Sequence, residues 1–96
     1  MNVAFTPRAQ AALDRMAARW RTHARNPQVF LDEVTEIVQR LSSSAETGVV
    51  AQRTERRTIY RMGAERTKLH FYYRIDGAQV VVLQVWSQFR QRPPRL

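Results

Sequence analysis

The sequence contains no cysteine, which excludes a disulfide framework, a thiolate metal site and a cysteine nucleophile. It has only two histidines, His23 and His70, far apart in the chain, so neither a metal nor a cofactor is expected. No stretch approaches the roughly 18 apolar residues of a membrane helix, and residues 1–8 lack the basic and then apolar run of a signal peptide. These absences predict a cytoplasmic protein without a membrane partner.

The length and the charge distribution narrow the class of protein further. With 96 residues, 44% of them apolar, the chain fits a single domain, residues 1–96, around one two-layer core. The net charge is +8, and it is concentrated in residues 49–96, which carry ten basic and only three acidic residues. The positive electrostatic field of such a charge distribution favours encounter with polyanions or acidic proteins. The alternative is a solvated arginine-rich surface without a dedicated ligand.

The first half of the sequence is predicted to form a short strand and two helices. The apolar alternation of residues 2–5 stops at Thr6-Pro7, where a threonine can cap a helix that begins with proline. Apolar residues then recur at three- and four-residue steps over residues 7–24, which predicts an amphipathic helix. Asn26-Pro27 repeats the cap and proline signal and opens a second helix, which the small polar residues 42–48 end as a loop.

The second half is predicted to form a sheet, because β-branched and aromatic residues alternate with polar ones. Residues 49–52 and 57–62 are interpreted as one long, bent strand, residues 69–75 as the next, and residues 80–86 as a central apolar strand. Asp76-Gly77 is a strong signal for a two-residue hairpin. The predicted fold is α+β with the order βααβββ, a helical hairpin packed on one face of a mostly antiparallel four-stranded sheet.

Several short segments occur in a joint order that is more specific than any one of them. They are Phe5-Thr6-Pro7-Arg8-Ala9, Phe30-Leu31-Asp32-Glu33-Val34, Ile37-Val38-Gln39-Arg40-Leu41, Gly48, Arg56-Arg57, Phe71-Tyr72-Tyr73-Arg74-Ile75-Asp76-Gly77, Val81-Val82-Leu83-Gln84-Val85-Trp86 and Arg90. In a basic chain of this length, the order resembles the RelE/ParE superfamily of toxins from bacterial type II toxin-antitoxin modules. The resemblance covers most of the chain and is nearest to the ParE-like branch.

The resemblance implies two different activities, one for each branch. The ParE-like branch implies a non-enzymatic toxin that inhibits DNA gyrase and is neutralised by a ParD-like antitoxin, whose C-terminal segment wraps around it. The RelE branch implies an endoribonuclease that cleaves mRNA in the ribosomal A site. A third alternative is an inactive or repurposed member that only binds a partner. Because one fold serves all of these, the residues must distinguish between them.

Cleavage of RNA by its 2′-hydroxyl requires groups that take and return a proton, and positive charge against the phosphorane. The resemblance to RelE-like enzymes implies a catalytic arginine at Arg90 and a further catalytic group at Lys68 or His70. Those enzymes also use a C-terminal tyrosine, whereas residues 91–96 read Gln-Arg-Pro-Pro-Arg-Leu and supply neither an acid nor a base. This departure favours the non-enzymatic inhibitor and leaves the endoribonuclease as the alternative.

The arginines of the second half are expected to meet on neighbouring strands. There they would bind acidic side chains of an antitoxin through bidentate arginine–carboxylate pairs, and the target when the antitoxin is gone. Phe71 and Tyr73 are assigned to the core, Trp86 to the core or its rim, and Tyr72 to the surface. An exposed edge strand would permit either a homodimer or an added antitoxin strand. The candidate binding residues are Arg53, Arg56, Arg57, Arg61, Tyr72, Arg74, Arg90 and Arg92.

Overall fold

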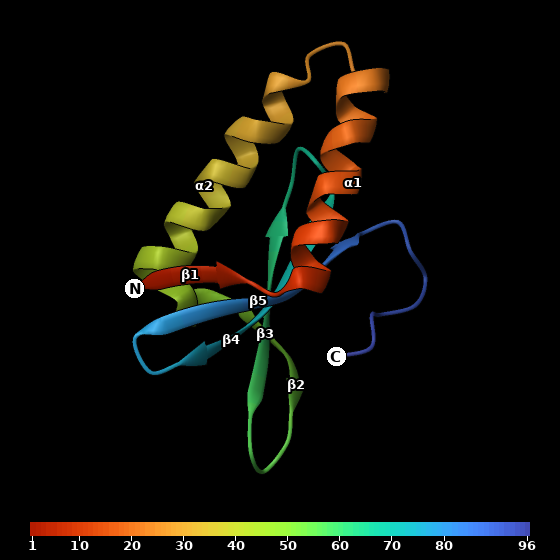
Figure 1. The fold of residues 1–96 in the computed structure, drawn as a ribbon. Coiled ribbons are helices and arrows are strands. Elements are labelled where there is room, and N and C mark those ends of the chain that lie inside the picture. Colours follow the sequence, from red (N-terminus) through yellow and green to blue (C-terminus); the bar gives the residue numbers. More distant parts are fainter.

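The computed structural model describes residues 1–96 and shows two α-helices packed against one five-stranded sheet (Figure 1). The first half contains β1 (Asn2–Phe5), α1 (Pro7–His23), α2 (Gln28–Ser44) and the short 3-10 helix η1 (Ala45–Thr47). The second half contains β2 (Val49–Arg53), β3 (Thr58–Ala64), β4 (Leu69–Asp76) and β5 (Gln79–Ser87). The α+β class is confirmed, but the sheet has five strands where four were predicted. Neither helix is long and apolar enough to cross a membrane.

The prediction of one long second strand is wrong, because residues 49–62 form a hairpin. β2 and β3 pair antiparallel, with Arg53 opposite Thr58. The turn between them is closed by a hydrogen bond from the backbone nitrogen of Thr54 to the Arg57 oxygen, 2.9 Å, and by one from the Arg57 nitrogen to the Thr54 hydroxyl, 3.2 Å. A threonine hydroxyl is a weaker turn signal than glycine or asparagine, so the sequence pattern did not reveal the turn between β2 and β3.

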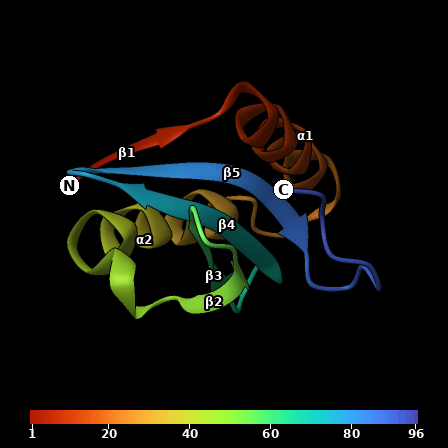
Figure 2. The same cartoon turned by 90° about the horizontal axis from the view of Figure 1, so that it is seen from below.

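The sheet order is β1-β5-β4-β3-β2, with β1 parallel to β5 and every other pair antiparallel. β5 therefore lies between two strands, as predicted for residues 80–86. The hairpin predicted at Asp76-Gly77 is confirmed: Asp76 pairs with Gln79 across a two-residue turn, and Gly77 adopts a φ of 61°. Figure 2 shows β1 and β5 running side by side.

The two helix starts differ in how they are capped. The Thr6 hydroxyl accepts a hydrogen bond from the Ala9 nitrogen at 3.1 Å, and Pro7 opens α1 as predicted. At α2 no side chain caps the helix, and Asn26 contributes only its carbonyl oxygen, which accepts from the Val29 nitrogen at 3.2 Å. α2 also continues through Ser44, where a loop was predicted from residue 42. The Ser43 hydroxyl donates to the Gln39 oxygen within the last turn, which makes serine compatible with the helix there.

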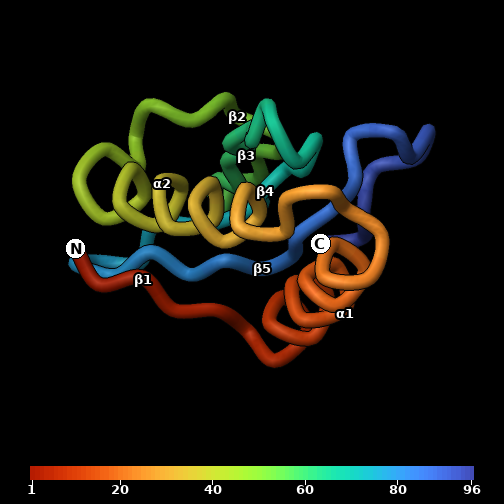
Figure 3. The backbone as a smooth tube through the Cα atoms, turned by 90° about the horizontal axis from the view of Figure 1, so that it is seen from above, coloured from red at the N-terminus to blue at the C-terminus, as the bar shows by residue number.

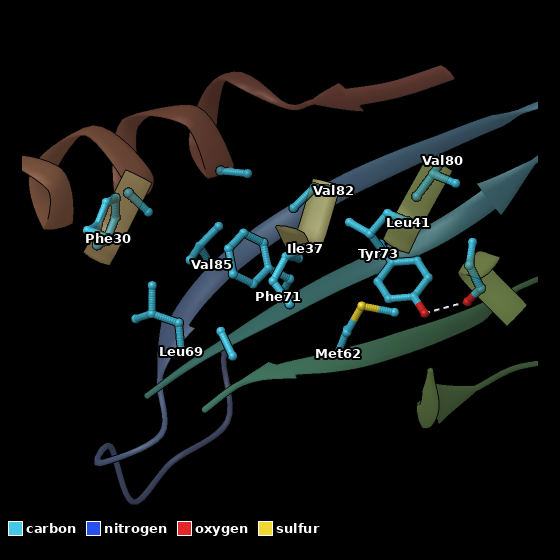
Figure 4. Packing of buried hydrophobic residues seen from close by; sticks show 14 residues of the cluster. Phe30, Ile37, Leu41, Met62, Leu69, Phe71, Tyr73, Val80, Val82 and Val85 are labelled. Carbon is cyan, nitrogen blue, oxygen red and sulfur yellow. Dashed lines mark hydrogen bonds between the residues drawn. The ribbon is translucent and has the colours of Figure 1, made fainter. Parts of the chain in front are cut away.

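The core lies between α2 and the face of the sheet that carries Phe71 and Tyr73. Both side chains are fully buried, which confirms their assignment. Figure 4 shows them between the valines of β5 and Met62 of β3, with Ile37 and Leu41 of α2 close by. α1 packs along β5, and Figure 3 shows α2 lying across the strands while α1 runs beside the end of β5. The other side of the sheet, which carries Tyr72, is called the far face below.

Residues 88–96, the C-terminal tail, fold back over the far face. Trp86 Nε1 donates to the Arg92 oxygen at 2.8 Å, and Arg57 donates from its guanidinium to the Leu96 oxygen at 2.9 Å. The tail thus leaves the end of β5, returns to within reach of the Arg57 side chain, and has its Pro94 buried. Tyr72 on β4 is only 4% exposed, so the prediction that it lies at the surface is wrong.

Candidate functional site

The hairpin formed by β2 and β3 carries the first group of predicted arginines. Arg56 and Arg57 lie in its turn and line the same hollow as Arg74 of β4. The charge there is partly balanced, because Asp76 lies 3.8 Å from the Arg74 guanidinium and Glu55 lines the hollow as well. Arginines further along the two strands extend this surface. The hairpin cluster is Arg53, Arg56, Arg57, Arg61 and Arg74.

A second group of arginines gathers where β5 ends. The Arg90 guanidinium carbon lies 4.1 Å from the centre of the Trp86 ring, a cation–π contact that orients both side chains. Arg92 and Arg95 line the same hollow, with Arg8 of α1 opposite them. The tail cluster is Arg90, Arg92 and Arg95. The structure therefore separates Arg90 and Arg92 from the hairpin cluster, with which they were grouped in the prediction.

Arg8 is a site residue that the sequence pattern did not reveal. Its guanidinium donates to the Arg95 oxygen at 2.8 Å across 87 positions of the chain. The contact arises because β1 pairs with β5, which places the start of α1 beside the tail. Only recognition of that parallel pairing from the sequence would have brought Arg8 and Arg95 together.

The tail cluster is not neutralised within the chain. The ion pairs of the structure join Arg66 to Glu33 and Glu36 and Arg74 to Asp76, so none involves Arg90, Arg92 or Arg95. Because these side chains are exposed, their positive charges are available to a partner. The arrangement can bind an anion of considerable charge.

The residues considered for RNA cleavage all lie at one end of the sheet. His70 pairs with Trp86 across β4 and β5, and Arg90 lies over the ring of that tryptophan. Lys68 lies in the turn before β4, and its carbonyl oxygen accepts from the Gln88 nitrogen at 2.8 Å. Burial, and then the charge of Arg61, lower the pKa of His70, so its imidazole is neutral at pH 7. A neutral imidazole can accept a proton, and the arginine supplies positive charge.

The tyrosines near this end are engaged in the fold. Tyr73 donates its hydroxyl to the Ala45 oxygen and stacks on Tyr60 with ring centres 5.5 Å apart. Tyr72 is buried and meets His70 edge to face at 6.2 Å. No group of three or more His, Asp or Glu side chains is placed to hold a metal ion. The chemistry that this end of the sheet offers is therefore cationic binding beside the imidazole of His70.

Comparison with known proteins identifies the family. The family model described as "ParE toxin of type II toxin-antitoxin system, parDE" matches residues 3–92. The solved structure described as "Chromosomal ParDE TA system from P. aeruginosa" shares the fold with a TM-score of 0.69 at 20% identity, covering 91% of this chain and 95% of that one. No curated protein sequence matches. Because the family model spans nearly the whole chain, this chain belongs to the ParE toxin family, the toxin component of a type II toxin-antitoxin system whose other component is an antitoxin protein.

Proposed function

We propose that this toxin inhibits DNA gyrase in the cytoplasm without chemical activity of its own, and that a ParD-like antitoxin neutralises it. The observation that carries the proposal is the match of residues 3–92 to the ParE toxin family. The tail around Arg90 supports it, because residues 91–96 provide positive charge but no acid or base for proton transfer. The exposed tail cluster is the surface that we assign to the target.

The hairpin cluster is the surface that we assign to the antitoxin. Arg56 and Arg57 are exposed, and the guanidinium of Arg57 makes only one hydrogen bond, so both can form bidentate pairs with carboxylates. At the other end of the hairpin, Val49 and Val50 of β2 pair with Arg61 and Tyr60, are 59% and 43% exposed, and provide an apolar anchor. An acidic segment with a few apolar residues fits this combination of contacts.

The edge strand β2 also bears on the oligomeric state. β2 has a neighbour on one side only, so its other edge can pair with an added strand. Each of two toxin copies carries a net charge of +8, and this like charge disfavours their association. An acidic strand meets no such repulsion. We therefore favour a toxin–antitoxin hetero-oligomer over a toxin homodimer.

The proposed target is tested by adding the purified toxin to a gyrase supercoiling assay and to a translation extract. We expect gyrase to stop supercoiling while mRNA stays intact, and the protein encoded by the adjacent reading frame to restore supercoiling. Cleaved mRNA with unaffected gyrase would refute the proposal. Silence in both assays would instead indicate an inactive or repurposed family member.

The antitoxin surface is tested with Arg56→Glu/Arg57→Glu. We expect this double variant to lose at least about tenfold in affinity for the antitoxin, because two carboxylates would face acidic side chains. Arg21→Glu/Arg25→Glu is the matched control, since it makes the same change of charge at exposed positions outside both clusters. If antitoxin affinity and toxicity were both unchanged in the first variant, the hairpin cluster would not be the binding surface.

One observation keeps the ribosome-dependent endoribonuclease as a second candidate. His70 and Arg90 approach Trp86 from β4 and from the tail, and so provide a proton acceptor and a cation at one end of the sheet. If His70 were the base, His70→Ala would abolish mRNA cleavage in the translation extract. A gyrase inhibitor would keep its activity in that variant.

A further inference from the structure

A continuous trough runs between α1 and the end of β5. Three adjoining hollows make it up, and all three share Arg90. The first lies between Arg8 and the tail, the second is lined by Arg15 and Arg19, and the third extends past Arg19 to His23 at the end of α1. Figures 2 and 3 show the tail leaving β5, looping outward and returning towards α1. Residues of α1 and of the tail line the first hollow together.

The α1 wall carries a row of arginines on one side of the helix. Arg8, Arg15 and Arg19 are separated by seven and four residues, spacings that return to the same face of an α-helix. At ~1.5 Å per residue the row extends over ~16 Å. A single nucleic-acid strand carries one phosphate per ~3.4 Å of duplex axis, so this length corresponds to about five phosphates. The opposite wall supplies Arg90, Arg92 and Arg95.

The charge of the trough has one sign only. The arginines that line the three hollows are Arg8, Arg15, Arg19, Arg90, Arg92 and Arg95, and no aspartate or glutamate lines any of them. Asp14, the only acidic residue of α1, accepts a hydrogen bond from Gln10 at 2.9 Å. No ion pair of the structure involves a trough arginine. The trough therefore concentrates positive potential that no ion pair within the chain balances.

We propose that this trough binds the phosphodiester backbone of a nucleic acid. The large apolar side chains exposed on this protein are Met1, Leu31, Val49, Val50 and Phe89, and none of them lines the trough. Protein partners require an apolar contact core, whereas nucleic-acid interfaces are polar and strongly cationic. Guanidinium groups also bind phosphate bidentately. The apolar side chains that do line the trough, among them Met16, Trp20 and Trp86, are partly buried, so the surface that it offers to a ligand is mainly cationic and fits phosphates better than a protein segment.

This binding site shares the tail cluster with the surface that we assign to the target, but it adds the arginines of α1 and can be tested without gyrase. The antitoxin surface proposed above lies on the hairpin cluster, and the arginines of α1 belong to neither cluster. Direct binding can be measured with the purified toxin alone. Failure of gyrase inhibition and failure of nucleic-acid binding are therefore separate results.

The test is a fluorescence anisotropy titration against single-stranded DNA, duplex DNA and single-stranded RNA of one length, over a series of salt concentrations. Arg15→Gln/Arg19→Gln is compared with Arg21→Gln/Arg40→Gln, which removes the same charge from exposed helix positions outside the trough. We expect the first variant to lose at least about tenfold in affinity at low salt, and its log–log salt slope to fall by about 1.5 to 2. The control should change less than about twofold.

A charge-preserving variant and a competing polyanion distinguish phosphate binding from misfolding and from general attraction to acidic polymers. Arg15→Lys/Arg19→Lys keeps both charges and should retain most of the affinity, which a loss caused by misfolding would not allow. The probe that binds most tightly, single-stranded DNA, duplex DNA or single-stranded RNA, identifies the class of nucleic acid that the trough prefers. The proposal is overturned if the unmodified toxin binds none of the three, if trough and control variants weaken binding equally, or if polyglutamate binds as tightly at the same salt.

Discussion

Glu33 of α2 accepts hydrogen bonds from both the backbone nitrogen and the hydroxyl of Thr67, at 2.7 and 2.6 Å. The same carboxylate accepts from the backbone nitrogen and Nε of Arg66, at 2.9 and 3.3 Å. Glu33 is only 5% exposed, so protein donors replace the water that an ionised carboxylate requires. These bonds fasten α2 to the turn between β3 and β4, next to the end of the sheet that carries His70 and Arg90.

Replacing Glu33 by glutamine should destabilise the toxin. The amide N–H group of glutamine would face the N–H and O–H donors of Thr67 and Arg66, which would then lack an acceptor. We therefore expect a loss of about 1–3 kcal/mol in the free energy of unfolding, measured by urea denaturation. Glu36→Gln is the control, because Glu36 is exposed and contacts only the half-exposed side chain of Arg66. Its cost should stay below about 1 kcal/mol. Equal costs for the two variants would contradict a structural role for the buried carboxylate.

The contribution of Glu33 should also depend on pH. Burial alone would raise the pKa of Glu33, but hydrogen bonds from Thr67 and Arg66 together lower it below its ordinary value of 4.5. A carboxyl whose pKa is lower in the folded state stabilises fully above the unfolded value and loses this effect as pH falls through the folded value. The stability difference between the wild type and Glu33→Gln should therefore shrink below about pH 4.5. A constant difference down to the acid limit would contradict this assignment.

Gly48 should not tolerate a side chain, because Tyr73 approaches it closely. A Cβ at Gly48 would lie 1.9 Å from the Tyr73 hydroxyl oxygen and 2.9 Å from the ring carbon that bears it. We expect Gly48→Ala to cost about 1–3 kcal/mol through overpacking. Tyr73→Phe removes the nearer of the two clashing atoms, so the double variant should cost less than the sum of the single ones. Urea denaturation of all four proteins measures this coupling, and strictly additive costs would contradict the clash.

Tyr73 should also set the alkaline limit of stability. Burial is the main cause that raises the pKa of Tyr73 from 10.0 to about 12. A group with a raised folded pKa stabilises fully below the unfolded value, and the effect is lost as pH rises through the folded value. Stability should therefore decline between pH 10 and about pH 12. In Tyr73→Phe this part of the decline should be missing when unfolding is followed against pH.

Much of the fold was predictable because its signals are local. The cap and proline at Thr6-Pro7 and the turn at Asp76-Gly77 act through neighbours in sequence, and both predictions are confirmed. The division of residues 49–62 into two strands was missed, because a threonine side chain rather than glycine or proline closes the turn. The parallel pairing of β1 with β5 was missed as well, because it joins residues from opposite ends of the chain.

The candidate site was less predictable, because long-range contacts determine which residues share a surface. Strand alternation correctly separated Tyr72 from Phe71 and Tyr73, but alternation states only that a residue faces the other side of the sheet. Whether that side is open to solvent depends on packing between distant parts of the chain, and Tyr72 is only 4% exposed. The approach of Arg8 to Arg95 is likewise invisible in the local sequence.

His70 should titrate below the ordinary range of a histidine. Burial lowers the pKa of His70 from 6.5, and the nearby charge of Arg61 lowers it further, while Glu65 acts in the opposite direction. An NMR titration of the imidazole protons should therefore give a midpoint below 6.5. Arg61→Gln should raise that midpoint without restoring the ordinary value, because the burial remains. A midpoint unchanged by the variant would show that burial acts alone.

The tail should loosen when Trp86 loses its indole N–H group. That group donates to the Arg92 oxygen at 2.8 Å, whereas Arg8 and Arg57 hold the tail further along. Trp86→Phe keeps an aromatic ring beneath Arg90 but removes the bond. Loss of about 1 kcal/mol of local stability would raise the open population about fivefold, so trypsin should cleave after Arg90 correspondingly faster.

Cleavage after Arg25, between the two helices, provides the internal control for that experiment. The hydrogen bond that Trp86→Phe removes joins Trp86 to Arg92 and does not involve this segment. A selective increase at Arg90 would locate the opening in the tail. An increase at both sites would indicate general destabilisation, and an unchanged rate at Arg90 would contradict the anchoring role of Trp86.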